Sequence, residues 1–280
     1  MNIRPLHHTL LSSLFVGLTS FAATAQQAPG IAGRLPDLPP GAKANPTPRL
    51  PDGKPDLGNG KGVWNPRVIA NLGGTGRSTR DRSPVERVID VPMQPWAKQL
   101  YDQRQANLSV DDPEGKCLPP GIPRLYATPF PFQVYQVPDR VIFIFEGGAH
   151  IWRVVYTDGR PHVKDPNPSF VGDSVGHWEG DTLVVDTIGF NETTWLDQEG
   201  HPHTEALHTI ERFTRQDEST LHYEVTIDDP KVFTRPWRMR MPLYLRTDLP
   251  RVLEDECYLD AEEAGKAIRG GHPEDRGGAR

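Results

Sequence analysis

The chain has 280 residues, with 31 Lys and Arg against 37 Asp and Glu, so its formal net charge is −6. A chain this acidic offers no overall attraction for polyphosphate, which argues against nucleic-acid binding as its main role. It contains 26 Gly and 29 Pro, and so many helix-breaking residues argue against a helical bundle and favour short strands joined by turns.

The first 25 residues are typical of a secretory signal peptide. Arg4 supplies the positive start, an apolar core runs from Leu10 to Ala23, and small residues at 23–25 form a cleavage site. The apolar run is too short to span a bilayer, and no later run approaches the roughly 20 residues that a membrane helix needs. The sequence therefore predicts an exported protein, periplasmic or secreted, without a membrane span.

The chain has two cysteines, Cys117 and Cys257. In an exported protein two cysteines most simply form one disulfide, and the alternative is two separate buried thiols. A redox or metal role is disfavoured because the chain has no Cys-x-x-Cys motif. A disulfide between these residues would tie the middle of the chain to its last predicted strand.

Composition divides the chain into four parts. Residues 1–25 are the signal peptide, and residues 26–64 form a Pro- and Gly-rich leader that either wraps the domain or stays mobile. Residues 65–260 form a single domain, and residues 261–280 form a charged, disordered tail. The oligomeric state is left open.

Apolar periodicity predicts one helix and a series of strands. The helix follows Pro95 and places Trp96, Ala97, Leu100 and Tyr101 on one face. The predicted strands, in chain order, are Val85–Val91, Phe132–Val137, Val141–Glu146, Ile151–Thr157, Thr182–Gly189, Leu207–Arg215, Thr220–Asp228, Trp237–Leu245 and Leu253–Leu259.

So many sequential strands favour a closed sheet, because an open sheet would expose two long edges to aggregation. The predicted fold is mainly β: an antiparallel up-and-down, lipocalin-like barrel with one short helix and a long irregular N-terminal leader. The alternative is a two-sheet sandwich. A barrel of this size can hold one small ligand inside it.

Several long motifs carry a family resemblance. Residues 174–187 read SVGHWEGDTLVVDT, followed by GFN at 189–191 and TWLD at 194–197. Matching pieces are CLPPGIPR at 117–124, DGR at 158–160, HTEALH at 203–208, ERF at 211–213 and TIDDP at 226–230. From about Pro51 to Tyr258 the chain resembles a large family of exported bacterial proteins. The resemblance implies one β-rich domain and assigns no activity, cofactor or catalytic residue.

The densest group of ionisable residues precedes the predicted strand 207–215. Its members are Asp197, Glu199, His201, His203, Glu205 and His208. His203 and Glu205 are two residues apart and share a face of an extended segment, where a carboxylate can orient an imidazole for proton transfer. This predicts His203 as base or acid, Glu205 as its partner and His208 as a second proton carrier. The alternative is a polar surface loop without chemistry.

The same residues offer a metal site. His201, His203 and His208, with Glu205 or Asp197, have the ligand types of a divalent metal that keeps one position open for water. The spacing does not match the helical His-Glu-x-x-His motif.

Gly172-Asp173-Ser174-Val175-Gly176 matches the Gly-x-Ser-x-Gly pattern of a nucleophilic serine. The strand before it and the helix after it that this motif requires are not predicted here, so a bend with a local hydrogen bond is favoured.

Arg153 lies among apolar residues of a predicted strand, and a buried guanidinium must be paired or face a ligand. Glu146 is the expected structural partner, and neutralising negative charge on a substrate is the functional alternative. Asp197, Trp195, Asn191 and Tyr126 are predicted to bind substrate, since aromatic rings and amides suit a flat organic ligand.

Three functional hypotheses follow. The first is a periplasmic, cofactor-independent lyase or isomerase that moves protons on a small, partly apolar organic molecule held in a barrel cavity. The second is a non-catalytic binding protein for a hydrophobic small molecule. The third is a metal-dependent hydrolase that uses the His and Glu cluster.

Overall fold

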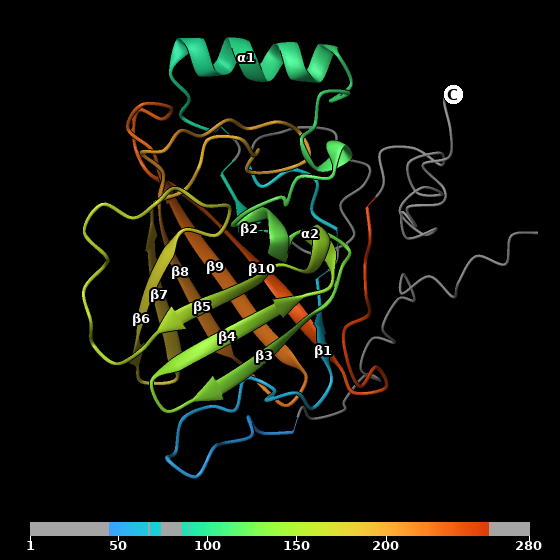
Figure 1. Cartoon of the computed structure of the whole chain (residues 1–280), viewed down its shortest axis with the longest axis vertical. Coiled ribbons are helices and arrows are strands. Elements are labelled where there is room, and N and C mark those ends of the chain that lie inside the picture. The colour runs from blue at the N-terminus through green and yellow to red at the C-terminus, as the bar shows by residue number, and fades with distance from the viewer. Residues whose placement is uncertain (1–44, 67, 74–85, 89, 258–280) are drawn as a thin grey trace, which may run out of the picture. The chain divides into compact units, whose positions relative to one another are not determined.

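The structure is a computed structural model that describes residues 45–66, 68–73, 86–88 and 90–257 (Figure 1). The predicted signal peptide, residues 26–44 of the predicted leader and the predicted tail lie outside the described residues. No helix in the described ranges has the length and apolar character that a membrane span requires.

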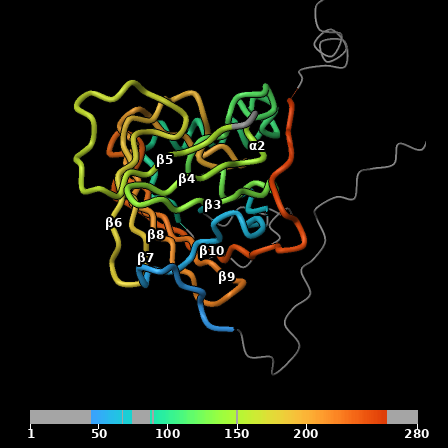
Figure 2. The backbone as a smooth tube through the Cα atoms, turned by 60° about the horizontal axis from the view of Figure 1, so that its bottom comes forward, coloured from blue at the N-terminus to red at the C-terminus, as the bar shows by residue number. Residues whose placement is uncertain are grey.

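Nine strands close into a β-barrel (Figures 1 and 2). They are β1 (Val63–Asn65), β3 (Phe132–Val137), β4 (Arg140–Phe145), β5 (Trp152–Tyr156), β6 (Asp173–Glu179), β7 (Thr182–Ile188), β8 (His208–Arg215), β9 (Thr220–Asp228) and β10 (Trp237–Arg246). A short strand, β2 (Glu86–Arg87), pairs with β10 beside the ring. The helices are α1 (Pro95–Ala106) and α2 (Gly147–His150), with the 3-10 turns η1 (Glu114–Lys116) and η2 (Arg124–Tyr126).

The shortest strand of the ring closes it. On one side of β1, Trp64 pairs with Phe132 of β3. On its other side, all three residues of β1 pair with β10, beginning with Val63 opposite Arg246. The sheet therefore has no separate second layer, and the alternative of a two-sheet sandwich is wrong.

Gly62 permits the close approach of β1 to β10. Its φ of +114° is a left-handed conformation that residues with a side chain rarely adopt. A Cβ at this position would lie 2.5 Å from the Arg246 carbonyl oxygen. Because any other residue would meet both obstacles, the point at which the ring closes depends on glycine.

The ring departs from the predicted up-and-down pattern at one junction. Strand directions can alternate all the way round a closed ring only if the number of strands is even, so a ring of nine needs a parallel pair. That pair is β5–β6, where Val155 lies opposite Ser174 and Tyr156 opposite Val175. Residues 157–172 form the long crossover that a parallel connection requires (Figure 2). The prediction of an entirely antiparallel barrel is wrong at this junction.

Side chains fill the interior of the barrel. Along β9 and most of β10 every second side chain is buried, as expected for strands with one face toward a core. Aromatic rings from several elements lie against one another with centroids 4.7–6.4 Å apart: those of Tyr126, Phe132, Phe143, Phe145, Phe213 and Tyr223. The ligand cavity predicted within the barrel is thus occupied by the protein's own core.

One end of the barrel is covered by residues 45–62, which lie at the end away from α1 (Figure 1). Arg49 forms an ion pair with Asp181 in the β6–β7 turn, and the Thr47 hydroxyl donates a hydrogen bond to the Arg215 carbonyl at the end of β8. Leu57 is fully buried, and its carbonyl accepts a hydrogen bond from the Trp64 indole. This part of the predicted leader therefore packs against the barrel.

Most predicted elements are confirmed. Of the predicted strand Val85–Val91, only the two residues of β2 are strand among the described residues, and the helix α2 was not predicted. Three further differences concern β6, β1 and the last predicted strand. β6 was not predicted, because only Trp178 of its inward positions is a large apolar residue, while Ser174 and Gly176 occupy the other two. β1 lies across the predicted end of the leader. The predicted strand at 253–259 is wrong over residues 253–257, which form no strand, and its last two residues lie outside the described ranges.

The predicted disulfide is confirmed. Cys117 and Cys257 lie with their sulfur atoms 2.09 Å apart and their Cα atoms 5.4 Å apart, at a sequence separation of 140. The bond joins the end of η1 to the segment that follows β10.

Candidate functional site

The end of the barrel near α1 carries the two pockets that form the candidate site. Pro95 starts α1 at a position that tolerates proline, and residues with high helix propensity fill most of the helix. The helix lies against the loop that joins β7 to β8. The Tyr101 ring stacks on His201 with centroids 4.4 Å apart, and Arg104 Nη1 donates a hydrogen bond of 2.9 Å to the Gly200 carbonyl.

The backbone after α1 is strained at Leu108, which lines the first pocket, and at Ser109, which lines both. Leu108 and Ser109 have φ values of 54° and 55°, the left-handed region that costs a residue with a side chain roughly 1–2 kcal/mol. Leu108 is 88% exposed. Backbone strain of this kind is concentrated at functional sites, which supports a role for these residues in ligand binding.

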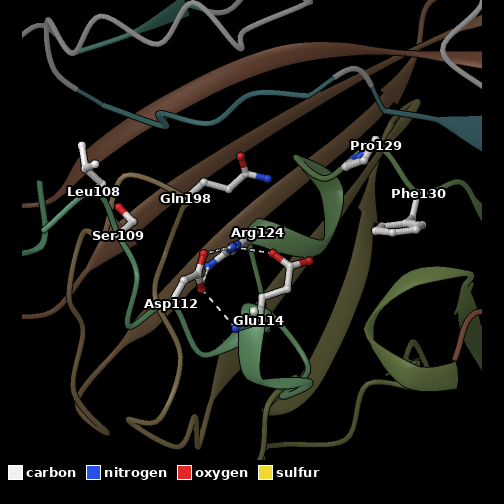
Figure 3. A pocket seen from close by; sticks show the side chains of 9 residues that line it. Leu108, Ser109, Asp112, Glu114, Arg124, Pro129, Phe130 and Gln198 are labelled. Atoms are coloured by element: carbon white, nitrogen blue, oxygen red, sulfur yellow. Dashed lines mark hydrogen bonds and ion pairs between the residues drawn. The ribbon is translucent and has the colours of Figure 1, made fainter. Parts of the chain in front are cut away.

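The first pocket has a volume of about 390 Å³. Its polar lining includes Ser109, Asp112, Glu114, Arg124 and Gln198, and Leu108, Pro129 and Phe130 supply apolar surface. Figure 3 shows Arg124 between the two carboxylates, with Gln198 on the other side of the guanidinium.

Arg124 holds both carboxylates of this pocket. Its two terminal nitrogens donate to the two Asp112 oxygens at 2.8 and 2.6 Å, and Nη2 also donates to Glu114. The Arg124 side chain is 2% exposed. Its Nε is buried without a hydrogen-bond partner in the described part of the chain. One guanidinium cation thus faces two carboxyl groups, which leaves an excess of negative charge when both are ionised.

The charges of Asp112 and Arg124 and the burial of the site all change the pKa of Glu114. Burial raises the pKa of Glu114 above its ordinary value of 4.5; Asp112 raises it further, and Arg124 opposes both effects. A carboxyl group with a raised pKa exchanges its proton closer to neutral pH than an exposed one does. Glu114 can therefore act as proton acceptor and donor toward a molecule in this pocket.

The second pocket adjoins the first at Ser109 and has a volume of about 280 Å³. Arg104 and Trp195 form part of its wall, and the Arg104 guanidinium carbon lies 4.4 Å from the centre of the indole ring. Leu100, Gln103, Asn107 and Asp111 complete the lining.

The structure does not bring the predicted His203–Glu205 pair together. His203 is buried: its Nδ1 donates to the Thr204 carbonyl at 3.2 Å, and its Nε2 accepts from the Thr194 hydroxyl at 2.8 Å. Glu205 is exposed and has no hydrogen bond or ion pair with any described residue. The predicted orientation of His203 by Glu205 is therefore wrong, because the backbone places the carboxylate in solvent.

The buried His203 has a consequence for acid stability. Burial lowers the pKa of His203 from its ordinary value of 6.5, so below pH 6.5 the unfolded chain binds this proton more readily than the folded chain. We expect the wild type to lose stability relative to His203→Gln as the pH falls from 6.5, by at most about 1.4 kcal/mol per pH unit.

Urea unfolding between pH 4.5 and 7.5 measures this difference. His177→Gln, at an exposed position, is the control and should follow the wild type. Parallel pH profiles of the wild type and His203→Gln would contradict the expectation.

The three imidazoles of the predicted metal site have three different partners. His201 Nδ1 contacts Asp197 at 2.7 Å, His203 contacts Thr194, and His208 Nε2 contacts Asp186 at 2.8 Å on the outer face of the barrel. Within the described ranges no three His, Cys, Asp or Glu side chains are arranged to hold a metal ion. The predicted set of ligands is not assembled.

Asp197 organises the loop against which α1 lies. Its buried carboxylate accepts hydrogen bonds from the backbone N–H groups of Leu72, Glu199, Gly200 and His201. Burial alone would raise the pKa of Asp197, but His201 and these N–H groups outweigh it and lower the pKa. Asp197 thus has a structural position behind the pockets rather than in their lining.

Arg153 is paired inside the barrel, and its partner is Glu211 instead of the predicted Glu146. Two hydrogen bonds join the guanidinium to Glu211, and the other three N–H groups donate to Tyr126, Ser174 and Thr187. Arginine has five such donors, so all are satisfied. Arg153 and Tyr126 are therefore parts of the core, and Glu146 instead accepts a hydrogen bond from the Leu253 N–H.

The remaining predicted residues divide between pocket and scaffold. Trp195 lies in the wall of the second pocket. The Asn191 side-chain oxygen accepts hydrogen bonds from the N–H and hydroxyl groups of Thr193 and so stabilises a turn. Ser174 lies within β6, bonded to Arg153 and Thr187, rather than on the turn that a nucleophilic serine requires.

Sequence reasoning missed Arg104, Asp112, Glu114 and Arg124. The one signal for them was the charged turn at 111–116 directly before Cys117. Its pairing with Arg124 depends on how residues 117–123 turn back, which periodicity does not reveal.

No protein-family model, curated protein or solved structure matches the chain. The resemblance to exported bacterial proteins thus remains an expectation from the sequence motifs, and the function rests on the geometry of the site.

Proposed function

We propose that the chain is an exported, cofactor-independent enzyme of the lyase or isomerase type, which moves a proton on a small, partly apolar organic molecule. The observation that carries the proposal is the Glu114 carboxyl, whose pKa is raised, in a pocket where it shares Arg124 with Asp112. The reaction is assigned to this pocket, not to the barrel interior or to His203.

Each side chain has a role in this proposal. Glu114 takes a proton from one atom of the substrate and returns it to another, so the carboxyl is regenerated without a redox change. Asp112 and Arg124 hold Glu114 in place. The side chains of Ser109 and Gln198 have no hydrogen bond to any described residue and are free to orient the substrate. Leu108, Pro129 and Phe130 accommodate its apolar part.

Export is part of the proposal. The predicted signal peptide and the Cys117–Cys257 disulfide, a bond typical of oxidising compartments, both support a periplasmic or secreted location. The proposal keeps one respect of the lipocalin-like description: the ligand binds near one end of a closed barrel, in a pocket outside its filled interior.

The ion pairs of Arg124 favour a second candidate function. Both carboxylates are already engaged by the guanidinium, an arrangement that also suits a non-catalytic protein that binds a polar small molecule. The two functions differ in whether a bound molecule exchanges protons.

Hydrogen exchange at carbon tests the proposal on a panel of small ketones, aldehydes and organic acids. Each compound is incubated with the full chain in D2O, and loss of C–H signals is followed by proton NMR. We expect the wild type to accelerate exchange for some of them and Glu114→Gln to lower that rate by about 10²–10⁴-fold.

Asp102→Asn supplies the matched control, because this exposed carboxylate on α1 pairs with Lys98 and lies outside both pockets. It should exchange like the wild type. Equal exchange in Glu114→Gln would overturn the assignment of Glu114, and binding without exchange would identify the second candidate.

A further inference from the structure

Arg104 differs from Arg124 and Arg153 in lacking a carboxylate partner among the described residues. Arg153 is paired with Glu211, and Arg124 with Asp112 and Glu114. Arg104, which is partly buried, forms no ion pair with a described residue and has one hydrogen bond, to the Gly200 carbonyl. Most N–H donors of the Arg104 guanidinium therefore have no partner among the described residues and can bond a ligand.

Arg215 shows that a missing carboxylate does not by itself indicate a site. It is buried and forms no ion pair with a described residue, but its guanidinium donates to three backbone carbonyls, those of Asp56, Asp217 and Glu218. The donors of Arg215 are used by the protein itself, whereas those of Arg104 border a pocket.

The guanidinium of Arg104 is held in place before any ligand arrives. Trp195 lies against it at 4.4 Å, and its methylene stem packs on Gly200, where an added Cβ would be 2.9 Å from Cδ. Burial lowers the pKa of Arg104 to about 10, with only partial opposition from Asp112 and Asp197. The fold thus leaves a cation partly desolvated and without a carboxylate partner among the described residues.

We propose that Arg104 binds the carboxylate of a small organic acid in the second pocket, with the rest of the molecule extending past Ser109 to Glu114. The second half of this statement rests on the proposed function, and the first half does not. The guanidinium fork matches the two oxygens of a carboxylate, and the Gln103 and Asn107 amides line the same pocket.

The charge of the pocket favours a monoanion over a phosphate dianion. Arg104 is a single cation, Asp111 lies in the same lining, and Asp112 and Asp197 are close enough to act on Arg104. Leu100 and the Trp195 ring offer apolar surface for the carbon skeleton. These surroundings suit a monocarboxylate with a short apolar body.

Paired ligands test the proposal. Benzoate, phenylacetate and hexanoate are each compared with their own amide by NMR titration of the full chain at pH 7, and phenyl phosphate is added as a dianion. We expect at least one carboxylate to bind, its amide to bind at least about tenfold more weakly, and phenyl phosphate to bind no better than the carboxylates.

Variants at Arg104 separate its charge from its shape. Arg104→Met keeps most of the aliphatic stem and should weaken carboxylate binding at least about tenfold, while Arg104→Lys keeps the charge without the fork and should lie between. Arg238→Met, at an exposed position on β10, is the control and should bind like the wild type.

Several outcomes would overturn the proposal: no carboxylate binds the wild type, an amide binds as well as its acid, phenyl phosphate binds more tightly, or Arg104→Met binds as well as the wild type. Glu114→Gln should keep carboxylate binding. If only the proposed function fails, carboxylates bind but their C–H protons do not exchange. If only this inference fails, an acid and its amide bind or exchange equally well.

Discussion

Replacing Glu211 by Gln is expected to lower the free energy of unfolding by about 3–5 kcal/mol, because it leaves the Arg153 cation buried without a counter-charge. Arg153 and Glu211 are 1% and 0% exposed, so water cannot take over the role of the carboxylate. The substitution conserves volume, and its effect therefore reports charge rather than packing. Urea unfolding followed by circular dichroism measures the change.

Two further variants determine whether the effect belongs to the ion pair. Tyr223→Phe removes one neutral hydrogen-bond donor to the same carboxylate and should cost only about 1–2 kcal/mol. The double variant Arg153→Met/Glu211→Leu removes both charges and should recover much of the loss, as replacement of buried pairs by apolar residues often does. A Glu211→Gln protein within about 1 kcal/mol of the wild type would contradict this account.

Removing the disulfide is expected to have the second large effect. The bond closes a loop between residues separated by 140 positions, and in the chain-entropy model its loss costs about 4–5 kcal/mol at 25 °C. The double variant Cys117→Ala/Cys257→Ala should therefore unfold at a much lower urea concentration. A second effect is expected at the pocket, because Glu114 lies three residues before Cys117.

Reduction of the wild type provides the control for this comparison. Adding a thiol reductant should lower the stability of the wild type to that of the double variant and leave the variant unchanged. A double variant as stable as the oxidised wild type would show that the bond contributes little.

The parts of the fold that could be predicted are those in which one face of a strand is buried and the other is not. In β9 the alternation from Leu221 to Ile227 directly reports the side that packs inward. Disulfide formation was predictable because the chain was predicted to be exported and its two cysteines leave one pairing. β6 escaped prediction because two of its three inward residues, Ser174 and Gly176, contribute no apolar side chain, and Ser174 bonds to Arg153 instead.

The site was less predictable than the fold for a physical reason. Clusters such as 197–208 stand out because their residues are neighbours in sequence, yet the backbone directs His201, His203 and His208 to different surroundings. By contrast, Arg104 and Trp195 are far apart in the chain and meet only because α1 lies over the loop after β7. The cluster at 197–208 thus belongs to a loop that borders the first pocket through Gln198, but none of its predicted residues lines either pocket.

At two junctions in the wall of the barrel, few residues pair between neighbouring strands. Within the single closed sheet, β3, β4 and β5 form one continuously paired group of strands, and β6–β10 with β1 form another. Between the two groups, β5–β6 contributes two residue pairs and β1–β3 one. Few backbone pairings therefore connect the strands across these two junctions. Arg153 lies on β5 in the smaller group of strands. Its guanidinium donates hydrogen bonds to Ser174, Thr187 and Glu211, which lie on strands of the larger group. Arg153 thus joins the two groups of strands through side-chain hydrogen bonds at a junction where few backbone residues pair.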